Sequence, residues 1–124
     1  MTAELFGIFL YALACIESGG DPSKPGKNND VGILQITPIM VEECNRIVGH
    51  NRWTLADRYD IVESYEMART FYEHHGDDWS VYKMARVWNQ GIKGYRDSPD
   101  NEEAHDHATR VNNIYRDILK KRGM

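Results

Sequence analysis

A carboxylate stands at the end of the most apolar segment of the chain. Residues 5–16 carry no charge, and Glu17 follows them directly, ahead of Ser18-Gly19-Gly20. A helix that is apolar on every side is a buried central helix. Burial disfavours the charged form of a carboxyl group, and the negative end of the helix dipole acts in the same direction. We therefore expect a raised pKa at Glu17, as a general acid requires; the alternative is a side chain that reaches solvent at the helix end.

Two side-chain amides, Gln35 and Asn89, are further candidates for a polar site. Gln35 is a lone amide within the apolar run 31–36, and its side chain can both donate and accept hydrogen bonds. Asn89 follows Trp88 and precedes Gly91 by two residues. An aromatic ring and nearby amides are a combination that suits sugar binding. Each residue also has a structural interpretation: a satisfied core amide, a core aromatic and a helix cap.

The composition is that of one globular domain over residues 1–124. Hydrophobic residues make up 41% and charged residues 27% of the 124 residues, which is ordinary for a soluble protein. The net charge of −4 argues against a nucleic-acid partner. The apolar run 5–16 is shorter than the roughly 18–20 residues that a membrane span needs. It also lacks a basic leading segment and a cleavage site, so no signal peptide is predicted.

Cysteine and histidine spacing gives no metal or redox motif. Cys15 and Cys44 permit one disulfide, but two buried thiols are the favoured interpretation. Four of the five histidines fall within residues 74–75 and 105–107, and neither group has a third ligand at a metal-type spacing. We expect neither a metal nor a cofactor.

Helices must position these candidate residues. Thr37 with Pro38 is a helix start, and Asp60 with Glu63 three residues later predicts a capping box. Ser80 is a third cap. Together with apolar periodicity, these signals predict helices over about residues 2–17, 38–48, 60–76, 80–91 and 103–121.

The remaining segments are predicted as loops, apart from one short apolar run. Residues 31–36 are expected to form a short strand or a turn, and residues 91–101 a loop. The third helix is expected to bury a face formed by Ile61, Tyr65, Ala68 and Tyr72. The predicted fold class is mainly α, arranged around a central buried first helix, with at most a small β-hairpin.

Three motifs occur here in the order found in the lysozyme-like lytic transglycosylases of the soluble (SLT) type, relatives of goose-type lysozymes. The chain resembles this family through Glu-Ser at the end of a core helix, Gly-x-x-Gln-x-x-Pro in the next hairpin, and (Tyr/Trp)-Asn-x-Gly. These are Glu17-Ser18, residues 32–38 and residues 88–91. Further matches at residues 38–41, 45–47, 54–58 and 66–69 resemble a phage and bacterial variant. The resemblance implies a fold of the α+β lysozyme superfamily.

The resemblance also implies an activity on peptidoglycan, whose glycan strands would be the partner. Glu17 would act as general acid and then base at the β-1,4 bond between N-acetylmuramic acid and N-acetylglucosamine. The muramic 6-hydroxyl would attack the anomeric carbon and leave a 1,6-anhydro product, so no second carboxylate is needed, whereas ordinary hydrolysis uses two. The implied substrate-binding residues are Ser18, Gly32, Gln35, Trp88 and Asn89, with Asp30 as an extra acid near the cleft.

The chain departs from the family pattern at two places. The family has a tyrosine in its last helix that hydrogen-bonds the acid, and alignment puts His107 or Asn112 there. The bond to Glu17 is then missing, or Tyr65 or Tyr72 supplies it. The third motif also reads Asn-Gln-Gly where the close variant has Asn-Gly-Gly-Pro, which predicts a differently shaped loop.

Three alternatives to a transglycosylase stay open. Asp30 could position water, as an aspartate does in goose-type relatives, and so give a hydrolytic muramidase; equally, Asp30 is an ordinary turn residue. The chain could also bind peptidoglycan without cutting it, or act on chitin instead. We expect a monomer without membrane attachment, made in the cytoplasm, that reaches the wall as phage lysins do or by another export route.

Overall fold

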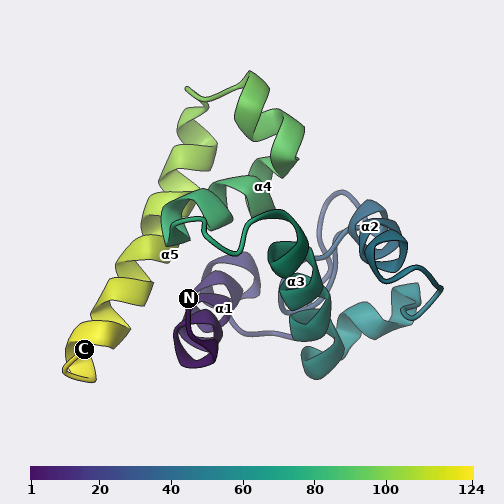
Figure 1. Cartoon of the computed structure of the whole chain (residues 1–124), viewed down its shortest axis with the longest axis horizontal. Coiled ribbons are helices and arrows are strands. Elements are labelled where there is room, and N and C mark those ends of the chain that lie inside the picture. The colour runs from purple at the N-terminus through teal and green to yellow at the C-terminus, as the bar shows by residue number, and fades with distance from the viewer. The chain divides into compact units, whose positions relative to one another are not determined.

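Five α-helices and one short 3-10 helix make up the regular structure of the chain. The computed structural model describes all residues, 1–124. Its elements are α1 (Ala3–Ser18), α2 (Pro38–Val48), η1 (Leu55–Tyr59), α3 (Ile61–His75), α4 (Val81–Asp97) and α5 (Glu102–Lys121), as Figure 1 shows. The β structure is limited to two isolated bridges, Pro25 with Val31 and Val31 with Ile36. The predicted mainly α fold class is confirmed, and residues 31–36 form a turn.

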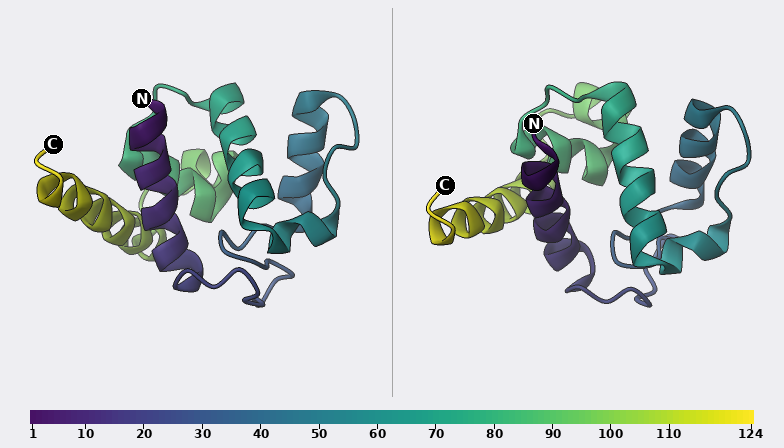
Figure 2. Two further views of the ribbon diagram at one scale, coloured as in Figure 1. Left: turned by 90° about the horizontal axis from the view of Figure 1, so that it is seen from below. Right: turned by 60° about the horizontal axis from the view of Figure 1, so that its bottom comes forward.

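These elements form two compact units. The terminal unit contains residues 1–16 and 78–124, and the middle unit contains residues 17–77. In the terminal unit α4 and α5 lie side by side. In the middle unit α2 lies beside α3, and η1 leads into α3 (Figure 2). The expectation of one domain over residues 1–124 stays a prediction.

Helix α1 buries most of the apolar run that marked it in the sequence. Its buried side chains are Ile8, Phe9, Leu10, Ala12, Leu13 and Ala14. Tyr11 is 58% exposed, because it lies on the same helix face as Glu4 and Gly7, which are also exposed. Cys15 is partly exposed, so its predicted full burial is wrong. The helix is therefore buried over a broad face rather than on every side.

Helix α2 begins and ends with the signals read from the sequence. The Thr37 hydroxyl accepts a hydrogen bond from the Met40 amide at 3.2 Å, and Pro38 opens the first turn. Gly49 ends the helix in the left-handed conformation (φ 84°), and its amide donates to the Asn45 carbonyl at 2.9 Å. Cys44 is a buried free thiol that donates to the Met67 carbonyl of α3 at 3.3 Å.

Helix α3 confirms one half of the predicted capping box. The Asp60 carboxylate accepts from the Glu63 amide at 3.0 Å. The Glu63 carboxylate accepts from the Trp53 indole instead of returning to Asp60, whose amide donates to the Asp57 carbonyl. Ile61 is 43% exposed, so its predicted burial is wrong; as the first residue of α3 it precedes the turns that contain the buried Ala68 and Tyr72.

The η1 helix was not predicted, although its start carries a local signal. The Asp57 carboxylate accepts from the Thr54 amide at 2.8 Å and from the Thr54 hydroxyl at 3.3 Å. The bond from the Thr54 amide to the side chain three residues later is the return bond of a capping box, with Asp in the place of Glu. The short helix places Arg58 at its inner side, where the side chain is buried.

Helix α4 extends beyond its predicted end. Ser80 caps it as expected, with a bond from the Lys83 amide at 3.1 Å. At Gly91 the backbone leaves the helical conformation (φ 77°, ψ 166°), and a further helical stretch then runs to Asp97. The predicted loop 91–101 is therefore wrong for its first part. Glycine at residue 91 permits the kink because it adopts positive φ without steric cost.

Gln90, at the point where the third motif departs from the family pattern, holds this kinked segment. Its side-chain oxygen accepts from Arg86 at 2.8 Å, and its side-chain nitrogen donates to the carbonyls of Gly94 (3.3 Å) and Ser98 (3.1 Å). Arg86 is buried and also donates to the carbonyls of Ser98 and Pro99. These bonds hold the kinked segment in place, and the predicted difference in loop shape from the family stays a prediction.

Across the whole chain, no helix combines the length and the apolar character that a membrane crossing requires.

Candidate active site

Glu17 lies in the last turn of α1, at the start of the middle unit. Its side chain is partly buried, and burial raises its pKa from 4.5 to about 8. The negative charge of Asp30 contributes to this rise, and the positive charge of Lys24 opposes it. This agrees with the raised pKa expected from the sequence. At pH 7 the carboxyl group therefore holds its proton in most molecules.

Ser18 fastens the end of α1 to the turn at residues 31–36. Its buried hydroxyl donates to the Ile33 carbonyl at 2.8 Å. It accepts from the amides of Gly20 (3.2 Å) and Asp21 (3.1 Å). Because these partners all belong to the protein, the geometry favours a role in placing Glu17 over a direct contact with a ligand.

Gly32 occupies a position that only glycine fits. Its φ is +86°, and a β-carbon there would overlap the carbonyl oxygen of Arg58. Its amide donates to the Lys24 carbonyl at 2.9 Å. The glycine of the second motif therefore allows two stretches of backbone to approach each other closely.

The Gln35 side chain is part of the same turn. Its nitrogen donates to the carbonyls of Lys24 (3.0 Å) and Gly32 (2.9 Å), and its own φ is +52°. The structural interpretation of this amide is thus confirmed for its nitrogen. Its oxygen and the Asp30 carboxylate both approach Gly26, where a β-carbon would overlap with them. Gly26 leaves the space in which these two acceptors converge.

Asp30 is a partly buried acid on the same turn, and its carboxylate accepts from the Asn28 amide at 3.0 Å. Its charge acts on Glu17, as the pKa of Glu17 shows. The middle unit therefore contains a second acid whose charge acts on Glu17. Of these two acids, Glu17 is kept protonated near neutral pH by burial.

Tyr72 is one of the two residues considered as the source of a tyrosine bond to Glu17. It is buried on α3, and its pKa is raised well above 10.0 by burial and by the charge of Glu17. Tyr65 is only partly buried. His107, one of the two residues aligned with the family tyrosine, has a pKa lowered to about 4 by burial and by the charge of Arg110. Because the charge of Glu17 raises the pKa of Tyr72, these two residues are electrostatic neighbours.

Trp88 and Asn89 belong to the terminal unit, where both lie on α4. Trp88 is partly buried and Asn89 is exposed. The structure therefore collects five of the predicted residues in the middle unit: Glu17, Ser18, Asp30, Gly32 and Gln35.

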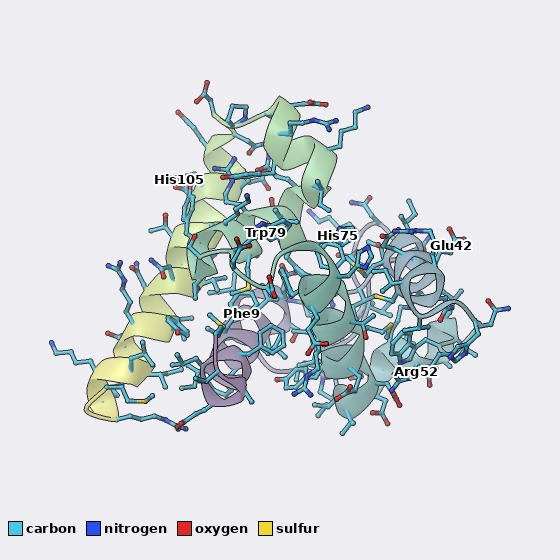
Figure 3. All side chains as sticks on the ribbon, viewed as in Figure 1. Phe9, Glu42, Arg52, His75, Trp79 and His105 are labelled. Atoms are coloured by element: carbon cyan, nitrogen blue, oxygen red, sulfur yellow. The ribbon has the colours of Figure 1, made fainter.

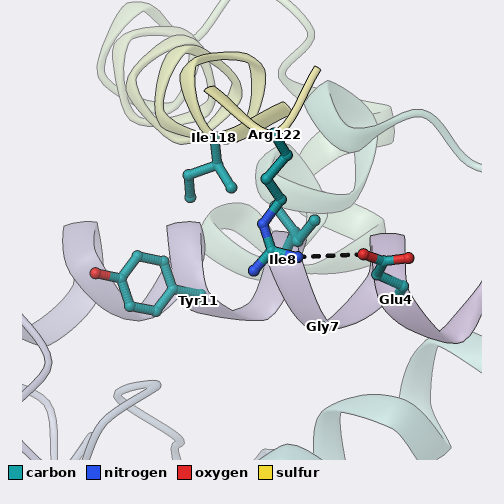
Figure 4. A pocket seen from close by; sticks show the side chains of 6 residues that line it. All are labelled: Glu4, Gly7, Ile8, Tyr11, Ile118 and Arg122. Carbon is teal, nitrogen blue, oxygen red and sulfur yellow. Dashed lines mark hydrogen bonds and ion pairs between the residues drawn. The ribbon is translucent and has the colours of Figure 1, made fainter. Parts of the chain in front are cut away.

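Two surface pockets lie within the units, and neither is lined by a predicted site residue. One, in the terminal unit, has a volume of about 400 Å³ between α1 and α5 and is lined by Glu4, Gly7, Ile8, Tyr11, Ile118 and Arg122 (Figure 4). Arg122 forms an ion pair with Glu4 there at 3.1 Å. The other, in the middle unit, has a volume of about 450 Å³ beside the end of α2.

The histidines form no cluster that could hold a metal ion with other ligands. His75, near the end of α3, faces α2 (Figure 3) and bonds to Glu43 at 3.0 Å. Glu43 also binds Arg46, and these hydrogen bonds lower the pKa of Glu43 to about 2.

Sequence reasoning missed Arg58 as a part of this site. Its side chain is 7% exposed and bonds to backbone carbonyls on the turn that contains Asp30 and Gln35. The sequence signal was its place in the stretch 54–58, which matched the family variant without indicating a role.

Comparison with known structures identifies the class of fold. The structure superposes on the crystal structure of the 70 kDa soluble lytic transglycosylase from Escherichia coli with a TM-score of 0.72. The match covers 94% of this chain and 24% of that protein, at 14% sequence identity, so the chain spans about a quarter of its length. The chain has a lysozyme-like, mainly α fold.

The family follows from the sequence profile. The profile described as "Transglycosylase SLT domain" matches residues 7–111. The chain therefore belongs to the transglycosylase SLT domain family, as its motifs indicated. No curated protein sequence matches the chain significantly.

Proposed function

We propose that this chain is a peptidoglycan lytic transglycosylase that uses Glu17 as its single acid and base. It cleaves the β-1,4 bond between N-acetylmuramic acid and N-acetylglucosamine. Membership of the family supports glycan cleavage. The observation that carries the proposal is the pKa of about 8 at Glu17, caused mainly by burial. A carboxyl group that holds a proton at neutral pH can donate it to a leaving oxygen.

The reaction conserves atoms without water. Protonated Glu17 donates its proton to the glycosidic oxygen, and the bond from that oxygen to the muramic C1 breaks. The muramic 6-hydroxyl forms the new bond to C1, and the Glu17 carboxylate accepts the hydroxyl proton. The acid returns to its starting form, and the products are a 1,6-anhydromuramic end and a free N-acetylglucosamine end.

Sugar-binding roles are proposed for polar groups within each unit, taken separately. In the middle unit the Gln35 oxygen is an acceptor for a substrate amide or hydroxyl, because its nitrogen is bound to the turn. In the terminal unit the exposed Asn89 amide and the Trp88 ring supply polar and aromatic contacts. Ser18 and Gly32 contribute by placing the acid and the turn.

Hydrolysis is the second candidate, and Asp30 is the observation that favours it. Asp30 acts electrostatically on Glu17, which is the arrangement of a site with two acids. An ionised Asp30 could activate water for attack on C1. The product would then be a reducing muramic end, which weighs one water more than the anhydro end.

Clearing of purified cell-wall sacculi tests the proposal. We expect the wild type to lower the turbidity and Glu17→Gln to lose at least about 100-fold in rate, the scale of general acid catalysis. Glu73→Gln, an exposed substitution on α3, is the matched control and should clear sacculi normally. Equal clearing by wild type and Glu17→Gln excludes Glu17 as the acid. No clearing by either favours a binding module, and chitooligosaccharides as substrate test the chitin alternative.

Mass spectrometry of the released muropeptides separates the two reactions. Anhydro products are expected from the wild type. Reducing ends in place of anhydro ends would assign the hydrolytic reaction, and their loss in Asp30→Asn would assign the water to Asp30.

A further inference from the structure

Arg58 is a buried cation whose hydrogen bonds all go to backbone carbonyls. It lies at the end of η1, and its Nε donates to the Leu55 carbonyl at 2.9 Å. One terminal nitrogen donates to the carbonyls of Asn29 (2.5 Å) and Ile36 (3.1 Å). A buried charge is costly unless it is well hydrogen-bonded, and a guanidinium group can bond several acceptors in a fixed geometry.

The Asn29 and Ile36 carbonyls lie at the two ends of one turn. Between them the Val31 amide donates to the Ile36 carbonyl (3.1 Å), and the Ile36 amide donates to the Val31 carbonyl (3.0 Å). Asn29 itself has a left-handed backbone (φ 60°), a conformation that needs support from its surroundings. Arg58 therefore holds both ends of residues 29–36 from one side chain.

A second contact joins Arg58 to the turn through its own backbone. Gly32 packs directly against the Arg58 carbonyl oxygen. That oxygen also accepts from the hydroxyl of Ser64, which is fully buried on α3, at 2.9 Å. The turn is thus held by Arg58 of η1 at three points, residues 29, 32 and 36, and Ser64 joins Arg58 to α3.

The turn is linked to the acid by the charge of Asp30 and by a hydrogen bond next to Glu17. It contains Asp30 and Gln35, and its Ile33 carbonyl accepts from Ser18, the neighbour of Glu17. The charged groups that act on Glu17 are Asp30 and Lys24, and the charge of Glu17 in turn raises the pKa of Tyr72. Displacement of the turn would move Asp30 and admit water to Glu17.

We propose that Arg58 is a positioning residue of the glycan-cleaving site, which holds the turn 29–36 so that Asp30 keeps its place near Glu17 and Gln35 keeps its place on the same turn. This rests on the proposed function of Glu17. Arg58 touches no reacting atom in this account; it acts through the turn.

The test is the titration of Glu17 in Arg58→Lys, followed by the NMR signal of its labelled side-chain carboxyl carbon. Lysine keeps the charge but cannot reproduce the guanidinium geometry. We expect the pKa of Glu17 to fall by at least about one unit, since the acid gains water and loses the charge of Asp30. The pH above which sacculi clearing declines should fall with it, and kcat should drop by about tenfold or more with little change in KM.

Two further variants make the experiment specific. Arg46→Lys, on the exposed face of α2, is the matched control and should leave the pKa of Glu17 unchanged. In an Asp30→Asn background, Arg58→Lys should lower the pKa of Glu17 by less than it does alone, because part of its effect passes through Asp30.

An unchanged pKa of Glu17 in folded Arg58→Lys overturns the proposal. If that variant does not fold, Ser64→Ala is used instead, because it removes the hydrogen bond to the Arg58 carbonyl and keeps the guanidinium group. A smaller fall in the pKa of Glu17 then supports the proposal, and an unchanged pKa overturns it. The titration does not depend on enzymatic activity. The proposal for Arg58 can therefore be overturned while the wild type still clears sacculi, and it can be supported in a protein that does not clear them.

Discussion

Gly32 lies against the backbone carbonyl oxygen of Arg58, so closely that a β-carbon at residue 32 would overlap this oxygen. The two residues are far apart in sequence, and their contact brings the turn 29–36 onto η1. The glycine of the second motif is therefore required by the contact between two backbones, as well as by its own positive φ.

Gly32→Ala should destabilise the protein more than a positive φ alone can explain. Alanine in the left-handed region costs about 1–2 kcal/mol, and the overlap with a backbone carbonyl adds at least about 2 kcal/mol more. Gly49→Ala is the matched control, because Gly49 has nearly the same φ (+84°) and open space around it. Chemical denaturation of both variants measures the difference; equal losses would show that the contact with Arg58 carries no energy.

Gly26→Ala should change the pKa of Glu17 and the cleavage rate, with only a small effect on the free energy of unfolding. The added β-carbon displaces the Asp30 carboxylate and the Gln35 oxygen. Both are ends of flexible side chains, so we expect a loss below about 1 kcal/mol. The cleavage rate should fall several-fold, and the pKa of Glu17 should fall as Asp30 moves away. Gly7→Ala is the control, because Gly7 lies on α1 with open space around it; this variant should change neither the cleavage rate nor the pKa of Glu17.

Glu17→Gln should stabilise the protein at high pH and not at low pH. The folded pKa of Glu17 is about 8, above its ordinary value of 4.5, so the folded state holds a proton that the unfolded chain releases between these values. The stability of the wild type therefore falls as the pH rises from 4.5 through 8, whereas glutamine stays neutral. The gain of the variant over wild type should grow across this window, up to about 5 kcal/mol at full ionisation. Denaturation at pH 5 and pH 9 checks this, and a gain that does not depend on pH would contradict it.

Gln90→Ala should release the segment after the kink of α4. The substitution removes the bonds with Arg86, Gly94 and Ser98, and we expect a loss of about 1–2 kcal/mol. Backbone amides of residues 92–101 should exchange faster with deuterium, while those of α2 keep their protection. Gln90→Glu keeps the acceptor for Arg86 and loses the donor, so it should show part of this effect. Unchanged exchange in Gln90→Ala would contradict the role of the network.

The sequence predicted those features that depend on neighbouring residues. Thr37, Asp60 and Ser80 cap helices through bonds to the third amide along the chain, so their short spacing identified the helix starts. The acid at the end of an apolar helix likewise followed from adjacent residues. Helix caps and apolar periodicity predicted the mainly α class, and the family motifs added the expectation of a lysozyme-like fold.

The features that sequence reasoning missed depend on distant partners. The Gln35 nitrogen bonds to a carbonyl eleven residues away, and the Ser18 hydroxyl to one fifteen residues away. The Arg58 bond to Asn29 spans 29 residues. No spacing rule connects such pairs, because the folded backbone brings them together. The Ser18 hydroxyl and the Gln35 amide, both predicted to contact substrate, therefore form hydrogen bonds within the turn region.

Titration of the Glu17 carboxyl group in the wild-type protein measures whether this acid holds its proton at neutral pH. The side-chain carboxyl carbon of labelled glutamate reports its own protonation by NMR from pH 4 to 10, with Glu17→Gln to assign the signal. A midpoint near 8 is the expected result. A midpoint near the ordinary value of 4.5 would show an ionised acid at neutral pH and contradict the account.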